Sequence, residues 1–139
     1  ILDEALKPDK PYKALCGQCE KCIEKCPTNA ITEPFVINSK QCIAYHTIEN
    51  RNETIPSDIS SKLNGWIAGC DICQDVCPWN KSVPENKDDE VKPKEWMNNL
   101  SFDSLNWNDE EWSDKLKGTT LKRIKPWMWR RNIKATIKN

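Results

Sequence analysis

The sequence has few of the residues from which a large core is built. Hydrophobic residues make up 37% of the 139 positions, below the globular norm of about 45–50%. It contains no apolar run of about 18 residues, the length that a membrane-spanning helix needs. The chain shows no signal peptide and begins Ile1-Leu2-Asp3 without an initiator methionine. We therefore expect a piece of a longer protein, one domain in size, that relies on more than aliphatic packing.

The net charge of zero hides an uneven distribution along the chain. Residues 1–84 carry 9 basic and 11 acidic groups, residues 85–114 carry 3 and 10, and residues 115–139 carry 9 and none. The C-terminal end is therefore a cationic segment of +9. Such a segment is typical of a surface that binds a phosphate backbone, although a basic helix is also often just a solvated face.

Cysteine, by contrast, is abundant. All eight cysteines lie within a window of 62 residues, at a local density above the roughly 8–10% that marks a cross-linked scaffold. The first four follow the pattern C-x2-C-x2-C-x3-C-P: Cys16, Cys19, Cys22 and Cys26, then Pro27. In bacterial ferredoxins this run directs three thiolates to one [4Fe-4S] cluster and the fourth to a second cluster.

The second cysteine group reads Cys70-x2-Cys73-x3-Cys77-Pro78, and Ile67 stands where its leading cysteine would be. The remaining cysteine, Cys42, completes the count from a distance. With the same crosswise rule, the sequence predicts two [4Fe-4S] clusters with four thiolates each. We name the ligands of cluster 1 the first set, Cys16, Cys19, Cys22 and Cys77, and those of cluster 2 the second set, Cys26, Cys42, Cys70 and Cys73.

Two other interpretations of the cysteines stay open on the sequence alone. Two four-cysteine zinc sites would also use eight thiolates, but zinc knuckles rarely need this spacing followed by proline. A disulfide framework would use the same even number of cysteines. Adjacent CxxC repeats suit such a framework poorly, and the sequence gives no sign of secretion.

Composition divides the chain into four segments. Residues 1–15 are expected to be a connector from an upstream domain, and residues 16–80 hold every cysteine. Residues 81–106 are expected to form an acidic, polar linker, and residues 107–139 basic helices. The fold class predicted is α+β, mostly helical and loop-rich, with a dicluster ferredoxin-like domain followed by C-terminal α-helices.

Local patterns predict several elements within these segments. A short pair of strands, broken at Pro34, is expected before Cys42, and helices are expected over 42–50 and 57–65. Asn108 and Glu111 form a capping-box pattern at the start of a helix that should end near Gly118. The apolar spacing after it predicts one or two amphipathic helices interrupted near Pro126.

The remaining chemistry-bearing residues have ordinary explanations beside functional ones. His46 could be a ligand or proton donor, but we expect an ordinary helical residue. Trp66 and Trp79 flank the second cysteine group and could carry electrons, although shielding the clusters from water is the expected role. The other tryptophans are expected to be packing anchors: Trp96, Trp107, Trp112, Trp127 and Trp129.

Taken together, the motifs resemble a known family. The segments CGQCEKCIEKCPTNAI, CIAYHTIE, GWIAGCDICQDVCPWN and GTTLKRIKPWMWRRNI resemble, in order and spacing, the C-terminal half of the epoxyqueuosine reductase family. The lone Cys42 and the CDICQDVCPWN block distinguish this pattern from simple ferredoxins, which carry two complete runs. Ala44, His46 and Asn29 depart from the residues usual in the family, which are Ser, Leu and Gly. Asn tolerates positive φ, so the turn at Asn29 can survive.

The resemblance implies an iron–sulfur and cobalamin-dependent oxidoreductase that reduces epoxyqueuosine to queuosine at the tRNA wobble position. An external reductant would supply electrons through two [4Fe-4S] clusters to cobalamin. The domain that binds most of the cobalamin and carries the catalytic acid precedes the clusters in the family, so this piece should be inactive alone and hold no catalytic residue. Asp71 is the better candidate for a cobalamin contact from this side, because Ala44 lacks the hydroxyl of its relatives.

The resemblance also gives the cationic end a partner. In the family this end belongs to a HEAT-like helical element that helps to hold tRNA near the anticodon, where aromatic or arginine side chains can stack on unpaired bases. The tRNA-binding candidates are Lys122, Arg123, Lys125, Arg130 and Arg131.

Two other functions remain as alternatives. One is a stand-alone dicluster electron carrier, which would not need the basic end. The other is a related cobalamin-dependent reductive dehalogenase, a class without this Lys/Arg-rich ending. The favoured interpretation further implies a cytoplasmic monomer with no membrane association.

Overall fold

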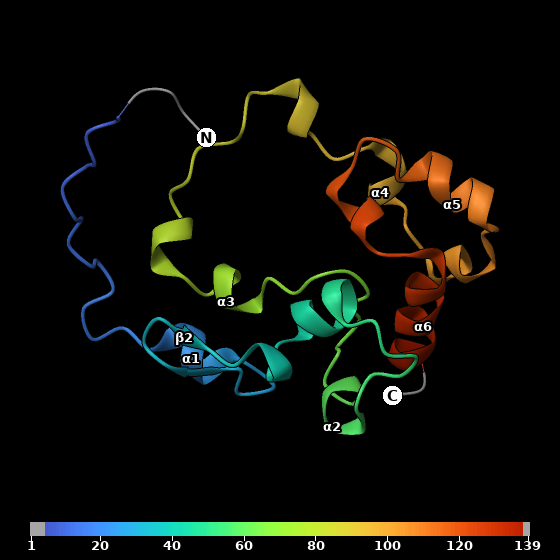
Figure 1. Ribbon diagram of the computed structural model, residues 1–139, viewed down its shortest axis with the longest axis horizontal. Coiled ribbons are helices and arrows are strands. Elements are labelled where there is room, and N and C mark those ends of the chain that lie inside the picture. Colours follow the sequence, from blue (N-terminus) through green and yellow to red (C-terminus); the bar gives the residue numbers. More distant parts are fainter. Residues whose placement is uncertain (1–4, 138–139) are drawn as a thin grey trace.

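A computed structural model describes residues 5–137. Figure 1 shows two neighbouring parts, with the cysteine-bearing loops around α1, β2 and α3 on one side and α4, α5 and α6 packed together on the other. The helices and strands are short, which confirms the helical, loop-rich fold class. They are α1 (Lys21–Lys25), β1 (Ile31–Glu33), β2 (Val36–Ile37), α2 (Ser57–Ser60), α3 (Ile72–Asp75), α4 (Glu95–Asn98), α5 (Asp109–Lys115) and α6 (Pro126–Ile137).

Single turns of tighter or wider helix connect these elements. A π-helical turn covers Tyr45–Glu49. The 3-10 turns are Ser39–Gln41, Pro78–Asn80, Asp89–Val91, Phe102–Asn106 and Thr120–Arg123.

The strand pair predicted before Cys42 is present. β1 and β2 form an antiparallel hairpin in which Ile31 pairs with Ile37 and Glu33 with Val36. Pro34 lies in the turn, and Phe35 closes it with a φ of 67°. The hairpin is the only sheet within residues 5–137.

The helix predicted over 42–50 is present over residues 43–49, and most of it is π-helical. In it, the Thr47 hydroxyl donates to the Ile43 carbonyl at 2.9 Å. The helix predicted over 57–65 is shorter than expected. It ends at Ser60, and Asn64 and Gly65 then take positive φ values of 48° and 88°, which a continuing helix does not allow.

The C-terminal helices begin where the sequence predicted. Asn108 caps α5, and its side chain accepts from the Glu111 amide at 2.9 Å while the Glu111 carboxylate accepts from the Asn108 amide at 2.9 Å. This is a complete capping box. Pro126 is the first residue of α6, the position where its missing N–H costs no helical hydrogen bond. The interruption near Pro126 is thus a helix start.

The larger core joins α5 and α6. Its buried members are Trp112, Leu116, Ile124, Met128, Trp129 and Ile133. The Trp129 indole donates to the buried Ser104 hydroxyl at 3.1 Å, and its ring stacks on Trp107 with centroids 6.1 Å apart. Four of the five tryptophans predicted as anchors pack in or against this core, and Trp127 is the exception because 41% of it is exposed.

The core also shortens the predicted linker. Trp96, Leu100 and Leu105 pack against it, although all three lie within residues 81–106. Only the first part of that segment, up to α4, stays clear of the core. The segment was predicted to be a linker because its composition is polar. Three widely spaced apolar residues are nevertheless enough to pack it on the core, since packing needs no continuous apolar run.

A second core lies beneath the cysteine loops. It contains Ile43, Ile55, Ile59 and Leu63, with Trp66 and Cys70 packed against it. Both cores are small, as the low apolar content predicted.

Two adjacent polar residues of α6 connect the cores. Arg131, only 9% exposed, donates to the carbonyls of Asn50 at 2.8 Å and His46 at 2.7 Å. Asn132, fully buried, donates to the carbonyls of Thr47 and Ile67, both at 2.8 Å. We call this pair the Arg131–Asn132 clamp. It fixes the segment that leads away from Cys42 and the segment that leads to Cys70.

Candidate iron–sulfur centre

The two CxxC-x3-C-P segments fold as structural repeats. α1 follows Glu20, whose φ and ψ are −117° and 15°, and α3 follows Asp71 with −111° and 12°. Each helix is one turn long, and the cysteine that closes it donates its amide back three residues, from Cys26 to Ile23 at 3.3 Å and from Cys77 to Gln74 at 3.1 Å. The short helices α1 and α3 also pack against each other. A local pseudo-symmetry therefore relates the first cysteine group to the second.

The second set of cysteines shares one pocket. Its lining includes all four sulfur-bearing residues predicted for cluster 2, Cys26, Cys42, Cys70 and Cys73. Apolar side chains complete the wall, from Ile31 and Ile37 of the hairpin to Ile43 and Ile72. The hairpin thus covers a four-thiolate cavity.

The sulfur atoms of this pocket lie in different electrostatic surroundings. Burial raises the pKa of the Cys70 thiol, and the neighbouring thiols of Cys42, Cys73 and Cys26 raise it further. Burial also acts to raise the pKa of Cys26, but hydrogen bonds from the Thr28 side chain and from nearby backbone amides outweigh it, and the net pKa is lowered. Cys26 is therefore already arranged to carry negative charge, as a metal ligand must.

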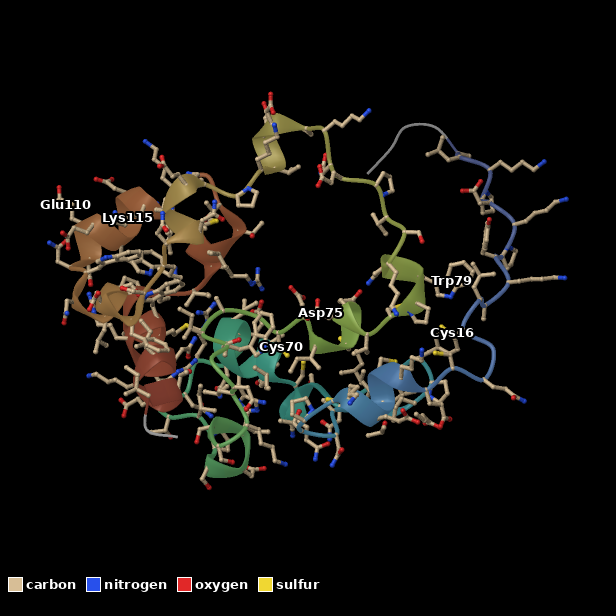
Figure 2. The ribbon with its side chains drawn as sticks, turned by 180° about the vertical axis from the view of Figure 1, so that it is seen from behind. Cys16, Cys70, Asp75, Trp79, Glu110 and Lys115 are labelled. Carbon is tan, nitrogen blue, oxygen red and sulfur yellow. The ribbon has the colours of Figure 1, made fainter. Side chains whose placement is uncertain are left out.

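The first set is more open. Cys16 and Cys19 are exposed, and Cys22 and Cys77 are partly buried. The Cys19 amide donates to the Cys16 carbonyl at 2.9 Å, closing a turn in which Gly17 takes a φ of 54°. α3, which lies just before Cys77, packs on α1, which carries Cys22. Figure 2 shows Cys16 and Cys70 well apart in this half of the molecule.

The donor set has the chemistry of an iron–sulfur site. Four thiolates per site is the ligand set of a [4Fe-4S] cluster, and four cysteines line one pocket. In a cube each thiolate binds a different iron, so the sulfur ligands stand further apart than around a single tetrahedral zinc.

His46 is a structural residue. It is buried. Its Nε2 lies 2.7 Å from the Lys40 carbonyl oxygen, and its Nδ1 lies 3.0 Å from the side-chain nitrogen of Asn50. Both ring nitrogens are thus occupied by the chain. This agrees with the ordinary role expected from the sequence.

The other residues expected near the clusters lie at or close to the surface. Asp71 is exposed at the start of α3, next to Cys70, and its side chain makes no capping hydrogen bond. Ala44 is half-buried two residues after Cys42. Trp66 packs on the second core, whereas Trp79 is 58% exposed.

The structure changes which of the predicted cationic residues are exposed. Arg131 was predicted to bind tRNA, and this prediction is corrected. Its guanidinium is buried and donates to backbone carbonyls inside the protein, so it belongs to the clamp and not to a cationic surface. Burial and the charge of Arg51 both lower its pKa. The sequence pattern placed it on a basic face because its carbonyl partners lie about 80 residues away.

Three further candidates are engaged with the protein but reach the surface. Arg123 forms an ion pair with Glu49, whose pKa it lowers, and Arg130 pairs with Asp109 at 2.6 Å. Lys122 donates to the Ser113 hydroxyl at 3.1 Å. Lys125 is exposed, and within the described part of the chain its side chain has no hydrogen-bond partner.

One surface feature was not found from the sequence. A groove of about 600 Å³ lies between the 53–60 segment and α6, and its lining includes Trp127, Arg130 and Lys134. Trp127 was expected to be a core anchor, but its ring faces the Arg131 guanidinium at 5.4 Å. The helical spacing of Trp127, Arg130 and Lys134 was the available signal, since i, i+3 and i+7 share a helix face.

The comparisons with known proteins first define a class. Residues 15–80 match the family model described as "4Fe-4S double cluster binding domain". Residues 15–80 therefore have the sequence of a double-cluster iron–sulfur domain. This agrees with the two four-cysteine sets described above.

The relatives then narrow the similarity to one kind of enzyme. The chain is 56% identical to an epoxyqueuosine reductase of Prochlorococcus marinus (strain NATL2A) over 97% of its length and 44% of that protein. It is 47% identical to an epoxyqueuosine reductase of Synechocystis sp. (strain ATCC 27184 / PCC 6803 / Kazusa), covering 99% of this chain and 48% of the relative. Over nearly its whole length the chain is therefore similar to epoxyqueuosine reductases, and it spans a little under half the length of these relatives.

Solved structures agree with this assignment. One is an epoxyqueuosine reductase with an epoxyqueuosine-modified tRNA stem loop, with a TM-score of 0.86 and 28% identity over 94% of this chain and 35% of that one. Another, from Bacillus subtilis, has a TM-score of 0.76 and 29% identity over 95% and 35%. Over residues 5–137, no helix has the length and apolar character needed to span a membrane.

Proposed function

We propose that this chain is the electron-transfer and tRNA-binding portion of an epoxyqueuosine reductase, the enzyme that reduces epoxyqueuosine to queuosine in tRNA. The observation that carries the proposal is the pair of repeated cysteine helices, with a distant Cys42 lining the same pocket as Cys26, Cys70 and Cys73. A simple electron carrier with two complete motifs does not need that distant ligand. The similarity to epoxyqueuosine reductases connects this arrangement to one reaction.

The ligand sets follow from the repeat. Three cysteines of the first group would hold cluster 1 with Cys77, and Cys70 and Cys73 would hold cluster 2 with Cys26 and Cys42. The fit of the second set rests on its shared pocket and on the hydrogen bonds to Cys26. When bound, a [4Fe-4S] cluster takes up and releases one electron at a time. The chain's own contribution is to hold the thiolates and to exclude water with the hairpin.

Cobalamin would be held mostly by a domain outside this chain. From this side the proposed contact is the exposed Asp71, which follows Cys70. Ala44, the second candidate, lies two residues after Cys42, a proposed ligand of the same cluster. Electrons would come from an external one-electron donor. We further propose a monomer in the cytoplasm, a compartment in which free thiols and oxygen-sensitive clusters are maintained.

The reaction is tested with the full-length protein. With cobalamin and a low-potential reductant, it should convert an epoxyqueuosine-containing tRNA anticodon stem loop to the queuosine form, measured by mass spectrometry of the nucleosides. This chain by itself should give no conversion. Dehalogenation of a halogenated substrate without epoxyqueuosine turnover would favour the reductive dehalogenase, and reduction of neither substrate would favour the electron carrier.

The surface proposed for tRNA is the cationic end without Arg131. Lys122 and Lys125 are exposed, while Arg123 and Arg130 each pair with a carboxylate, Glu49 and Asp109. The solved relative with a modified tRNA stem loop supports this partner. Exposed lysines bind phosphate as point charges, and each contact releases condensed counterions.

Neutralising two of these lysines should weaken tRNA binding in a salt-dependent way. In the double variant Lys122→Gln with Lys125→Gln, we expect the negative slope of log K against log salt to become less steep by about one to two. Each phosphate contact contributes about 0.7–0.9 to the size of that slope. Binding of the stem loop by the full-length protein at several salt concentrations measures the slope. Lys81→Gln with Lys87→Gln, in the acidic segment, is the matched control and should leave it unchanged. An unchanged slope in the first variant would remove this surface from the proposal.

A further inference from the structure

The hydrogen bonds to cysteine sulfur are distributed unequally. Within residues 5–137, the Ala30 amide donates to Cys26 Sγ at 3.2 Å, and the Thr28 hydroxyl lies 3.6 Å from the same atom. A third donor, the side-chain amide of Gln74, lies 3.8 Å from Cys73 Sγ. All three act on the second set. No hydrogen bond to the sulfur atoms of Cys16, Cys19, Cys22 or Cys77 is found in the described part of the chain.

The repeat shows where this inequality comes from. Cys26-Pro27-Thr28 in the first copy corresponds to Cys77-Pro78-Trp79 in the second. Thr28 is only 4% exposed, whereas Trp79 is 58% exposed. A small buried hydroxyl thus stands beside one closing cysteine, and at the equivalent place beside the other stands a large exposed ring with no sulfur contact.

The chemistry of the contact determines its direction. A cysteine that binds iron is a thiolate, so it can only accept, and the Thr28 hydroxyl must donate. Thr28 has no other hydrogen-bond partner for its hydroxyl within residues 5–137, and a buried hydroxyl is normally paired. A donor to a ligand sulfur stabilises the more negative, reduced form of an iron–sulfur centre and raises its reduction potential.

We propose that Thr28 is a positioning residue that raises the reduction potential of the iron–sulfur group held by Cys26 without affecting the other group. This inference rests on the proposed ligand sets. It concerns the contribution of one hydroxyl to one site, whatever the absolute potentials of the two sites are. Trp79 gives the other site no such donor, so the chain can adjust one potential independently of the other.

The test replaces the hydroxyl without changing the shape of the side chain. In the full-length protein, reconstituted anaerobically without cobalamin, two reduction couples are measured by potentiometric titration followed by electron paramagnetic resonance. Thr28→Val should make reduction of one couple about tenfold less favourable, since one hydrogen bond to a charged acceptor is of that order. A tenfold change corresponds to about 59 mV for one electron. The other couple should not move.

Three further variants make the result specific. Thr28→Ser retains a hydroxyl and should restore the potential of the unmodified protein. Thr28→Ala should behave like Thr28→Val, and Thr120→Val, which removes an exposed hydroxyl far from any sulfur contact, should change neither couple. Unmoved couples, equal shifts in both, or a serine variant that behaves like valine would overturn the proposal. So would loss of the clusters in both Thr28→Val and Thr28→Ala, which would indicate a purely structural role.

The result also separates this inference from the proposed function. If the unmodified protein binds fewer than two four-iron clusters, the proposed function and ligand sets fail. If it binds both and the Thr28 variants shift neither couple, only the inference about Thr28 fails.

Discussion

Replacing Cys42 with alanine is expected to remove one of the two clusters and to leave the other intact. Cys42 lines the pocket of Cys26, Cys70 and Cys73 and belongs to neither cysteine motif. A [4Fe-4S] cluster with three thiolates loses its full ligand set, whereas the first set keeps all four. Iron and acid-labile sulfide per chain should both fall by about half, measured after anaerobic reconstitution of the full-length protein.

Double variants test the crosswise assignment itself. If Cys26 and Cys42 hold the same cluster, Cys42→Ala with Cys26→Ala should lose no more iron than Cys42→Ala alone. If Cys77 belongs to the other set, Cys42→Ala with Cys77→Ala should lose nearly all of it. Such non-additivity is the signature of residues that act as one unit. Equal losses in the two double variants would show that the sets are divided differently.

Replacing Arg131 with methionine is expected to be among the most destabilising single changes outside the cysteines. The guanidinium satisfies buried carbonyls of His46 and Asn50 and also binds the Asn132 side chain at 2.9–3.0 Å. Methionine fills similar space but leaves these acceptors unpaired, at about 1–3 kcal/mol for each buried group. We expect a loss of about 3–5 kcal/mol in the free energy of unfolding.

The neighbouring arginine provides the control. Arg130 pairs with Asp109 near the surface and donates to one carbonyl, that of Trp107 at 2.7 Å. A surface ion pair contributes about 0–1 kcal/mol, and a single hydrogen bond about 0.5–1.5 kcal/mol. Arg130→Met should therefore change the unfolding midpoint in urea only slightly, compared with Arg131→Met under the same anaerobic conditions. Equal destabilisation by the two variants would contradict the clamp.

The predictions that succeeded rest on interactions between residues close in sequence. The capping box of Asn108 and Glu111 spans three residues, and the hairpin around Pro34 is decided by its own turn. The cysteine spacing is equally local, because each run of three to four residues places successive thiolates on one loop. Such features can be seen without knowing the tertiary structure.

The features that the sequence did not predict depend on distant partners. In the sequence Arg131 is one of nine cations near the C-terminus. Its buried role depends on the carbonyls of His46 and Asn50, which are distant in sequence. Trp96 lies in a polar segment, and its packing role depends on its contact with the α5–α6 core. The π-helical geometry of Tyr45–Glu49 was not predicted, and there the Thr47 hydroxyl donates to the Ile43 carbonyl and accepts from the Gly69 amide, 22 residues away. Tertiary contacts decide these positions, and they leave little trace in local patterns.

Metal analysis of the full-length protein, reconstituted anaerobically, tests the central claim most directly. Two four-iron cubes predict about eight irons and about eight acid-labile sulfides per chain, with a Mössbauer spectrum of [4Fe-4S] clusters alone. Four irons per chain, or two zinc ions without sulfide, would contradict the account.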